Sequence, residues 1–162
     1  MAALLTGVRH MKAIGFRAEP RGMNWAVVES AGEPVLVARD TWGAPKTFKE
    51  ADALKALRAR VLEIIAQYKP SRAVVRLPET VGKEGNKTSA RQRSRVEGVV
   101  MEACASQGVE VVAGPLATIG SRMGTQSAKT YLSRDEVRNI EYPSKNVNVR
   151  ESIVAAVAGL EK

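Results

Sequence analysis

The order of its short apolar runs constrains this chain of 162 residues more than any other sequence feature. Three such runs, at 12–16, 23–30 and 35–42, open the chain and are separated only by the turn segments 20–22 and 31–34. Connections this short join antiparallel neighbours, because a crossover between parallel strands needs about a dozen residues or more. The first part of the chain therefore predicts a three-stranded meander.

Helical patterns and further strands alternate after the meander. Thr47 and Glu50 have the spacing of a capping box, and the apolar periodicity behind them predicts a helix that ends before Pro70. A strand is expected at 72–77, followed by a polar loop at 78–87 and a second helix. The apolar face of that second helix is predicted to consist of Val96, Val99, Val100, Ala103 and Cys104.

A fifth strand at 109–114 and two helices complete the pattern. Ser133 and Glu136 predict the start of a short helix, and Asn148 and Glu151 the start of the last one, both from capping-box spacing. The order βββαβαβαα, with helical crossovers, places strands one, four and five parallel. We expect an α/β fold with a mixed five-stranded sheet flanked by helices, forming a single domain over 12–162 after an N-terminal extension over 1–11.

The charge and composition of the chain limit the kinds of partner that it can bind. The formal charge is +8, which suits a polyanion, with nucleic acid first and an acidic membrane surface second; the alternative is charge that serves solubility alone. Aromatic residues make up only 4%, which argues against base stacking on an aromatic platform. One cysteine and one histidine exclude a disulfide within the chain and an ordinary zinc site, and they favour a cytoplasmic setting. No apolar run approaches the roughly 20 residues of a membrane span, so no membrane partner is expected.

Three local strings, taken in order, add to this pattern. They are "AIGFRAEPRGMNWAVVE" near the start, "YKPSRAVVRLPETVGKEGNKTSARQRSRVEGVVMEACASQGVEVV" in the middle and "NVRESIVAAVAGL" near the end. Together they resemble the RuvC-type Holliday-junction resolvases of the ribonuclease-H-like superfamily, over nearly the whole chain from Met11 onward. The resemblance implies a ribonuclease-H-like fold.

The same resemblance implies an acidic metal site, and this sequence departs from it. In that family four carboxylates hold two magnesium ions, which clamp the scissile phosphate and activate water. The matching positions here are Arg17, Arg76, Asn148 and Glu151, so that one carboxylate remains. Guanidinium groups stay charged at neutral pH and repel a metal ion. We therefore expect no catalytic residues, no metal and no cofactor.

Two roles remain open for Arg17 and Arg76. With Glu151 they could form a structural arginine–carboxylate cluster in place of the metals, or they could contact a phosphate. A competing interpretation gives the metal site to displaced acids, Glu19 and Glu79, together with Glu151. That would make the chain an active Mg²⁺-dependent endonuclease. Otherwise Glu19 and Glu79 are ordinary solvated loop carboxylates.

Positive charge is concentrated in one segment. Residues 69–95 hold eight Lys and Arg against two Glu, a net +6 of the chain's +8. Within it Lys87, Arg91 and Arg95 follow one another at four-residue intervals and form one stripe of a helix. The alternative is a solvated helix face. The predicted nucleic-acid-binding residues are Lys83, Lys87, Arg91, Arg93, Arg95, Arg122 and Lys129.

The leading hypothesis is a catalytically inactive RuvC-like protein that binds branched or duplex DNA through a basic face. The first alternative is the active endonuclease described above. The second is a protein-interaction regulator of a phage or mobile element, in which the basic face meets an acidic protein. Gly98 lies inside a predicted helix, and the resembled family uses this helix for homodimers, so a homodimer is a further expectation.

Overall fold

The three opening runs form the predicted meander. The computed structural model describes residues 10–30, 32–79 and 87–161. In it β1 (Met11–Glu19) pairs antiparallel with β2 (Gly22–Ser30), which pairs antiparallel with β3 (Pro34–Gly43). Strand β1 begins at Met11, which the sequence placed in the N-terminal extension. Residues 1–9 lie outside the described residues, so the extension and the domain limits stay predictions.

Two parallel strands complete the sheet. Strand β4 (Arg72–Arg76) lies beside β1, and β5 (Glu110–Gly114) lies beside β4. The order is β3-β2-β1-β4-β5, with β1, β4 and β5 parallel. The mixed five-stranded sheet is thereby confirmed, because helical crossovers place these strands side by side in one direction.

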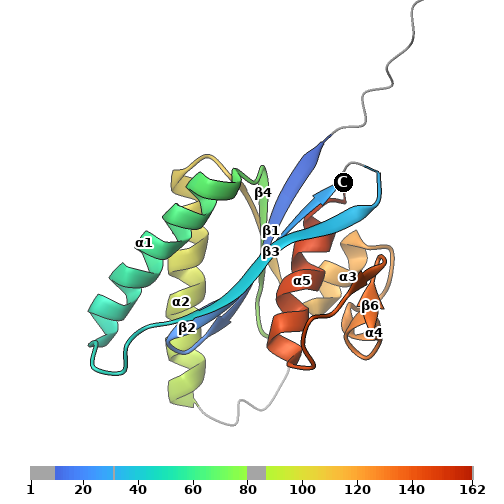
Figure 1. Ribbon diagram of the computed structural model, residues 1–162. Helices are drawn as coiled ribbons and strands as arrows, with labels where there is room; N and C mark the ends of the chain where they lie inside the picture. The colour runs from blue at the N-terminus through green and yellow to red at the C-terminus, as the bar shows by residue number, and fades with distance from the viewer. Residues whose placement is uncertain (1–9, 31, 80–86, 162) are drawn as a thin grey trace, which may run out of the picture.

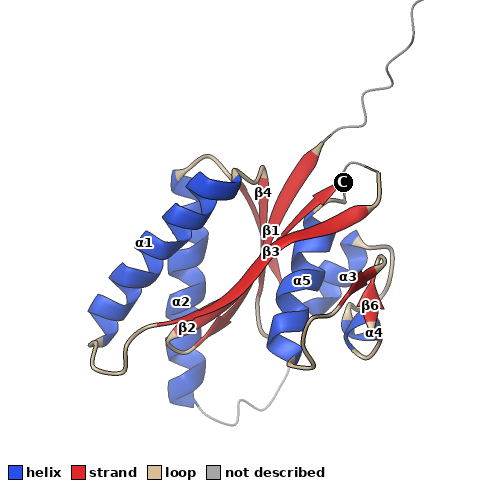
Figure 2. Cartoon of the chain, in the orientation of Figure 1, coloured by secondary structure: helices blue, strands red, loops and turns tan. Residues whose placement is uncertain are grey.

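Helices cover both faces of the sheet (Figures 1 and 2). Helices α1 (Glu50–Tyr68) and α2 (Lys87–Ser106) lie on one face, and α5 (Val147–Gly159) lies on the other. Helices α3 (Leu116–Arg122) and α4 (Lys129–Leu132) and a hairpin of β6 (Glu136–Val137) and β7 (Ile140–Glu141) pack beside α5. None of these described helices is long and apolar enough to cross a membrane.

Two of the three capping boxes that the sequence predicted are wrong. One was expected at the start of α1 and the other at the start of a short helix. Helix α1 begins at Glu50 itself, because residues 45–48 form a turn that Arg21 holds by donating to the carbonyls of Pro45 (3.0 Å) and Phe48 (2.7 Å). Ser133 follows the end of α4, and Glu136 enters the β6–β7 hairpin, so no helix starts between them. The end of α1 at Tyr68, before Pro70, is as predicted.

The third capping box is wrong by two residues, and the shift matters for the site. Helix α5 is capped by Asn146, whose side-chain oxygen accepts from the backbone N–H groups of Asn148 (2.9 Å) and Val149 (3.3 Å). Asn146 therefore satisfies two of the free N–H groups at the helix start. The side chains of Asn148 and Glu151 are left available for contacts outside the helix.

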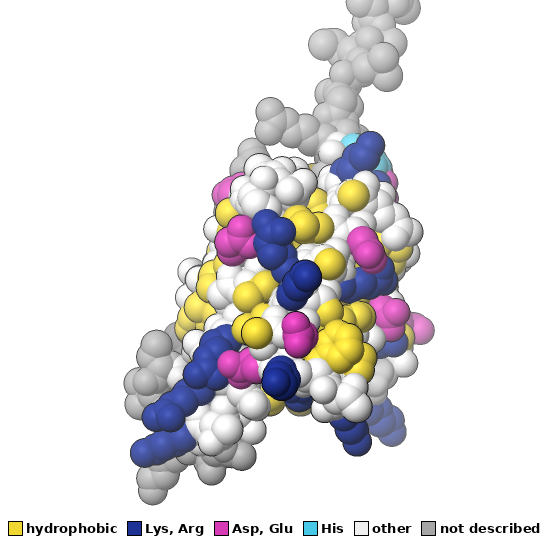
Figure 3. Space-filling view, turned by 90° about the vertical axis from the view of Figure 1, so that its left-hand side faces the viewer, with side chains coloured by type: hydrophobic (Ala, Val, Ile, Leu, Met, Phe, Trp, Pro, Cys, Tyr) yellow, Lys and Arg dark blue, Asp and Glu magenta, His cyan; other side chains and the backbone are white. Residues whose placement is uncertain are grey.

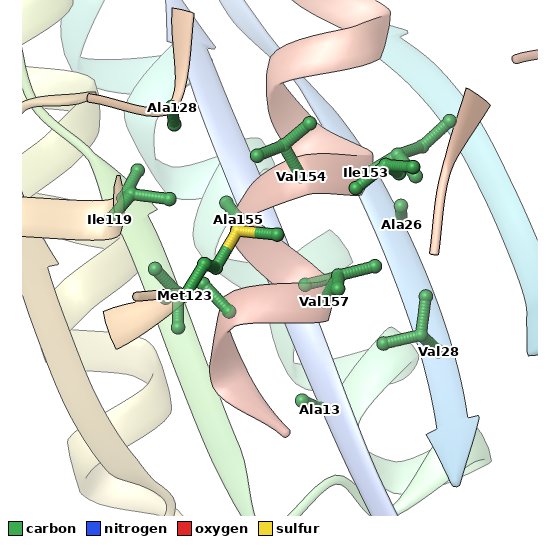
Figure 4. Packing of buried hydrophobic residues seen from close by; sticks show 14 of the residues in the cluster. Ala13, Ala26, Val28, Ile119, Met123, Ala128, Ile153, Val154, Ala155 and Val157 are labelled. Atoms are coloured by element: carbon green, nitrogen blue, oxygen red, sulfur yellow. The ribbon is translucent and has the colours of Figure 1, made fainter. Parts of the chain in front are cut away.

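A buried apolar core fills each side of the sheet. The core between the sheet and α5 contains Ala13, Val74, Ile153 and Val157, together with Ile119 and Met123 from the α3 segment (Figure 4). Helix α5 lies so close to β1 that a Cβ on Gly15 would be 2.1 Å from the carbonyl oxygen of Ser152. Only glycine permits this approach. It fixes the height of α5 above the sheet, and hence the place of the neighbouring Glu151.

Candidate nucleic-acid interface and arginine–carboxylate cluster

Arg17 and Arg76 are brought together by the pairing of β1 with β4. They are register partners near the ends of the two parallel strands, which lie about 4.8 Å apart. Side chains alternate between the faces of a strand, and both arginines follow that alternation onto the α5 side of the sheet. The predicted adjacency of the two arginines is therefore present, although like charges at this separation repel each other.

Glu151 of α5 joins the two arginines. Its Oε2 atom accepts a hydrogen bond from Nε of Arg17 and lies 3.4 Å from Nε of Arg76. All three side chains are nearly excluded from water, with exposed fractions of 12% for Arg17, 10% for Arg76 and 6% for Glu151. The second anchor of each guanidinium is a main-chain oxygen: Nη1 of Arg17 donates to Ala18 and Nη1 of Arg76 to Leu77, at 2.8 and 2.9 Å.

The charge balance of this cluster is incomplete. Burial lowers the pKa of Arg76 from its ordinary value, and Arg17 and Arg93 act in the same direction, while Glu151 and Glu79 act against them. The Nε–H of Arg76 is buried and has no hydrogen-bond acceptor, because its approach to Glu151 is an ion pair without hydrogen-bond geometry. One carboxylate thus serves two buried guanidiniums.

Asn148 and Glu19 form a second polar group beside the cluster. The Glu19 carboxylate accepts from Nδ2 of Asn148 at 3.1 Å and from Nδ2 of Asn24 at 3.3 Å. The side-chain oxygen of Asn24 in turn accepts from the hydroxyl of Thr41 at 2.7 Å. Glu19 is therefore held by two amides, where the competing interpretation required it to face a metal ion.

Glu79 has a different partner. Its Oε1 atom accepts the backbone N–H of Leu116 at 3.0 Å, at the first residue of α3. The carboxylate thus satisfies a free helix N–H group, and Pro115 before it offers no side-chain cap. Glu79 and Glu19 consequently bind different partners, a helix N–H group and two side-chain amides, at different places in the fold.

The donor set at the ends of β1 and β4 does not fit magnesium. Guanidinium groups offer only N–H donors, whereas Mg²⁺ requires oxygen ligands. Within residues 10–30, 32–79 and 87–161, no group of three or more His, Cys, Asp or Glu side chains is placed to hold a metal ion.

Sequence reasoning missed a buried acid outside the cluster, Glu97 of α2. This side chain is 3% exposed and its Oε2 atom has no hydrogen-bond partner. Burial raises the pKa of its carboxyl, and Arg93, Arg17 and Arg76 oppose that rise, so the carboxyl lies within the field of all three. Its position one helical turn after Arg93 and seven residues before the buried Cys104 was a usable signal.

The predicted basic stripe on α2 is present in part. Lys87 and Arg91 are exposed, and neither side chain has a hydrogen bond or ion pair to another described residue. Arg95 instead donates to both carboxylate oxygens of Glu50 on α1, at 2.9 and 3.0 Å. Figure 3 shows Lys and Arg side chains in a row along the lower left of the α1–α2 side. Lys83 lies outside the described residues.

The two residues predicted near 119–129 differ in their availability. Arg122 donates to the main-chain carbonyls of Glu161 (2.9 Å) and Ala158 (3.4 Å), beyond and within the last turn of α5. Its guanidinium is thus used to satisfy a helix end. Lys129, at the start of α4, is exposed. Lys129 therefore remains available to a partner.

Comparison with known proteins supports the fold through structure alone. No family model and no curated protein sequence matches the chain. The structure of Thermus thermophilus RuvC in complex with a Holliday-junction substrate has a TM-score of 0.74 and 16% identity, covering 92% of each chain. A second structure of Thermus thermophilus RuvC has a TM-score of 0.71 and 18% identity, covering 91% of this chain and 92% of that one.

A mitochondrial protein has the same architecture. The yeast mitochondrial Holliday-junction resolvase Ydc2 has a TM-score of 0.58 and 7% identity, covering 93% of this chain and 78% of its own. Identities this low show the fold and no more. The chain thus has the ribonuclease-H-like fold of the RuvC resolvases, as the sequence predicted.

Proposed function

We propose that this chain is a catalytically inactive RuvC-like protein that binds branched or duplex DNA through a basic face, without metal-dependent cleavage. Two features support the proposal. The scaffold is shared with resolvases, one of which is described in complex with a Holliday junction. The ends of β1 and β4, where the resembled family places metal-binding carboxylates, hold Arg17 and Arg76 instead.

The arginine pair with its shared carboxylate carries the proposal. At an effective dielectric constant of about 20, a divalent ion about 5 Å from one guanidinium is repelled by roughly 7 kcal/mol. Glu151 offsets about one such term, because its single charge is shared by Arg17 and Arg76. The repulsion by the second guanidinium remains. The centre therefore favours anions over metal ions.

The competing active-endonuclease interpretation has less support. It needs Glu19, Glu79 and Glu151 to face one another, and each already has a different partner. Glu19 accepts from amides, Glu79 accepts a helix N–H, and Glu151 accepts from Arg17. Rearrangement of all three would be required before a metal ion could bind.

The DNA-binding face is proposed to be smaller than the sequence suggested. Among the residues predicted to bind nucleic acid, Lys87, Arg91 and Lys129 are exposed without a described partner, whereas Arg95 and Arg122 are held within the chain. Helices α2 and α5 begin at the same end of the molecule, at the bottom of Figure 1. The Arg17–Arg76 pair lies at the strand ends next to them, so Lys87, Arg91 and the cluster belong to one end of the fold.

Binding without cleavage can be tested directly. Purified protein is mixed with a labelled four-way junction or a duplex in the absence of divalent ions, and affinity is followed by fluorescence anisotropy between 50 and 200 mM salt. Each phosphate that the protein neutralises is expected to add about 0.9 to the steepness with which log affinity falls with log salt concentration. Absence of binding at low salt would contradict the proposal and favour an acidic protein as the partner of the basic face.

A homodimer through α2 is part of the same proposal. Gly98 is exposed in the middle of α2, and nothing lies within 4 Å of a Cβ placed on it, so no contact within the described chain accounts for a helical glycine. A groove beside it is lined by Leu54, Lys55, Arg58, Arg95, Val99 and Glu102. Sedimentation equilibrium of the wild type and a Gly98→Arg variant tests this: a dimer lost in the variant is expected, and a wild-type monomer at high concentration contradicts it.

The proposal places the protein in the cytoplasm, in keeping with a nucleic-acid partner and with a single cysteine, Cys104, that is buried and reduced. Burial raises the pKa of the Cys104 thiol to about 12, so the thiol is inert at neutral pH.

A further inference from the structure

Glu97 is a buried carboxyl group that neither the core nor the Arg17–Glu151–Arg76 cluster uses. Its side chain comes from the same face of α2 as Val100 and Cys104, and its Oε2 atom has no hydrogen-bond partner in the described structure. The Nε–H groups of Arg93 and Arg76 are also buried without an acceptor. Buried charged groups without full partners are costly to keep, so this arrangement requires a physical reason.

The charges around Glu97 come from three elements. Arg93 lies one turn earlier on α2, Arg17 is on β1 and Arg76 is on β4, and all three influence the ionisation of the carboxyl. Glu151 on α5 already pairs with Arg17 and Arg76. The acid nearest to Arg93 along α2 is Glu97, one helical turn later. Burial raises the pKa of Glu97, so its carboxyl is neutralised at a higher pH than that of an ordinary glutamate.

We propose that Glu97 is a positioning residue of the nucleic-acid interface, which acts through Arg93 and takes up a proton when a phosphate backbone binds. The inference rests on the proposed function, since it concerns the same basic face. A phosphate that approaches Arg93 adds negative charge beside an ionised carboxylate, and the repulsion raises the free energy of the ionised form. One proton moves from solvent to a Glu97 oxygen, and no bond of the nucleic acid forms or breaks.

The sign of the pH dependence follows from linkage. If binding takes up a proton, affinity rises as the pH falls, by up to one log unit of Kd per pH unit for one proton. As the pH falls, affinity begins to rise near the pKa of Glu97 in the complex and levels off below the pKa of Glu97 in the free protein. The pKa of Glu97 in the free protein lies above the ordinary value for glutamate. A neutral isostere removes the dependence and keeps the high affinity.

The experiment measures Kd for a duplex without terminal phosphates from pH 5 to 8, at constant ionic strength and without divalent ions. Terminal phosphates are omitted because they titrate in this range. Glu97→Gln is expected to bind more tightly than the wild type at pH 8 and to lose the pH dependence. Glu63→Gln removes the same charge from an exposed position of α1 and is expected to retain the wild-type slope. His10→Gln, which removes the single histidine, is also expected to retain it.

A second readout does not depend on a variant that folds. Calorimetric titration of the wild type in two buffers of different ionisation enthalpy measures proton uptake on binding, which is expected between zero and one per site. Wild-type binding that is independent of pH, or a Glu97→Gln variant with the wild-type slope, overturns this inference and leaves the proposed function intact. Absence of binding at every pH overturns the proposed function, and the inference with it.

Discussion

Arg17 and Arg76 lie in register on adjacent parallel strands and share one carboxylate, that of Glu151. Two like charges are thus placed side by side at nearly buried positions, and a single acid from the helix packed above them holds both. In this cluster a carboxylate neutralises cations, whereas the resemblance to RuvC-type resolvases implies carboxylates that metal ions neutralise. The charges at the centre are thus opposite in sign to those that the resemblance implies.

Loss of Glu151 tests the importance of this arrangement for stability. Glu151→Gln removes the carboxylate that two buried guanidiniums share, and a loss of about 3–5 kcal/mol in the free energy of unfolding is expected. Urea denaturation gives the value. The matched control is Glu102→Gln, whose partner Arg58 is exposed, and its midpoint is expected to stay near the wild type. Equal effects of the two changes would show that the cluster has no special role.

Two glycines offer a paired test of packing. Gly15→Ala places a Cβ 2.1 Å from the Ser152 oxygen and 2.3 Å from the Ala156 nitrogen, so α5 must shift and a loss of about 1–3 kcal/mol or more is expected. Gly98→Ala meets open space on α2, and a gain of about 0.5–1 kcal/mol is expected. Thermal or urea unfolding of the monomer compares them. A tolerated Gly15→Ala would contradict the close approach of α5 to β1.

The sheet was predictable because its signals are local. Short turns fix the meander, and helices between β4, β5 and their neighbours fix the parallel order. The starts of the helices were less predictable, since competing contacts decide them. Arg21 holds the turn before α1, and Asn146 caps α5 two residues before the expected position. The first contact joins residues far apart in the sequence. The second depends on which of several neighbouring polar residues caps the helix.

Stability should depend on the ionisation of Glu97. Its pKa in the folded protein is raised, so the folded state binds more protons than the unfolded state, and stability falls as the pH rises from the unfolded value toward the folded one. Glu97→Gln is therefore expected to be more stable than the wild type at pH 7, with a difference that shrinks as the pH falls to 4. Urea midpoints over this range give the test. A difference that grows at low pH would contradict the burial of an unpaired carboxyl.

Carboxylates introduced at the centre should create metal binding. The variant Arg17→Asp, Arg76→Glu, Asn148→Asp, with the native Glu151, places two acids at the ends of β1 and β4 and two on the first turns of α5, and Mg²⁺ is expected to raise its unfolding temperature by mass action. The neutral variant Arg17→Asn, Arg76→Gln is the control and is expected to show no such shift. An equal Mg²⁺ effect on the wild type would show that the arginines do not exclude the ion.

The site was predictable only in outline. The positions of Arg17 and Arg76 could be brought together from strand order, because parallel neighbours end at the same edge. Glu151, on α5, could be placed beside them only through the resemblance to RuvC-type resolvases. The use of Arg95 and Arg122 within the chain could not, because Glu50 and the end of α5 meet them only in the folded structure. Glu97 escaped notice because a charged residue between apolar positions of a helix is usually solvated.

The free cations of the basic face should set the salt dependence of DNA binding. Lys87→Gln with Arg91→Gln is expected to weaken binding and to lower the log–log salt slope by about 1.8, if each residue neutralises one phosphate. Arg60→Gln, which removes a charge paired with Glu63 on α1, is the control and should leave the slope unchanged. An unchanged slope in the double variant would move the interface elsewhere on the surface.

The proposed function requires a centre that binds a junction without cutting it, and a cleavage assay measures both properties at once. Wild-type protein is incubated with an end-labelled four-way junction in Mg²⁺ or Mn²⁺, and the same samples are analysed on native and denaturing gels. The predicted result is a protein–junction complex whose strands remain intact at every metal concentration. Nicked strands that depend on the metal ion and increase with the amount of protein would contradict it.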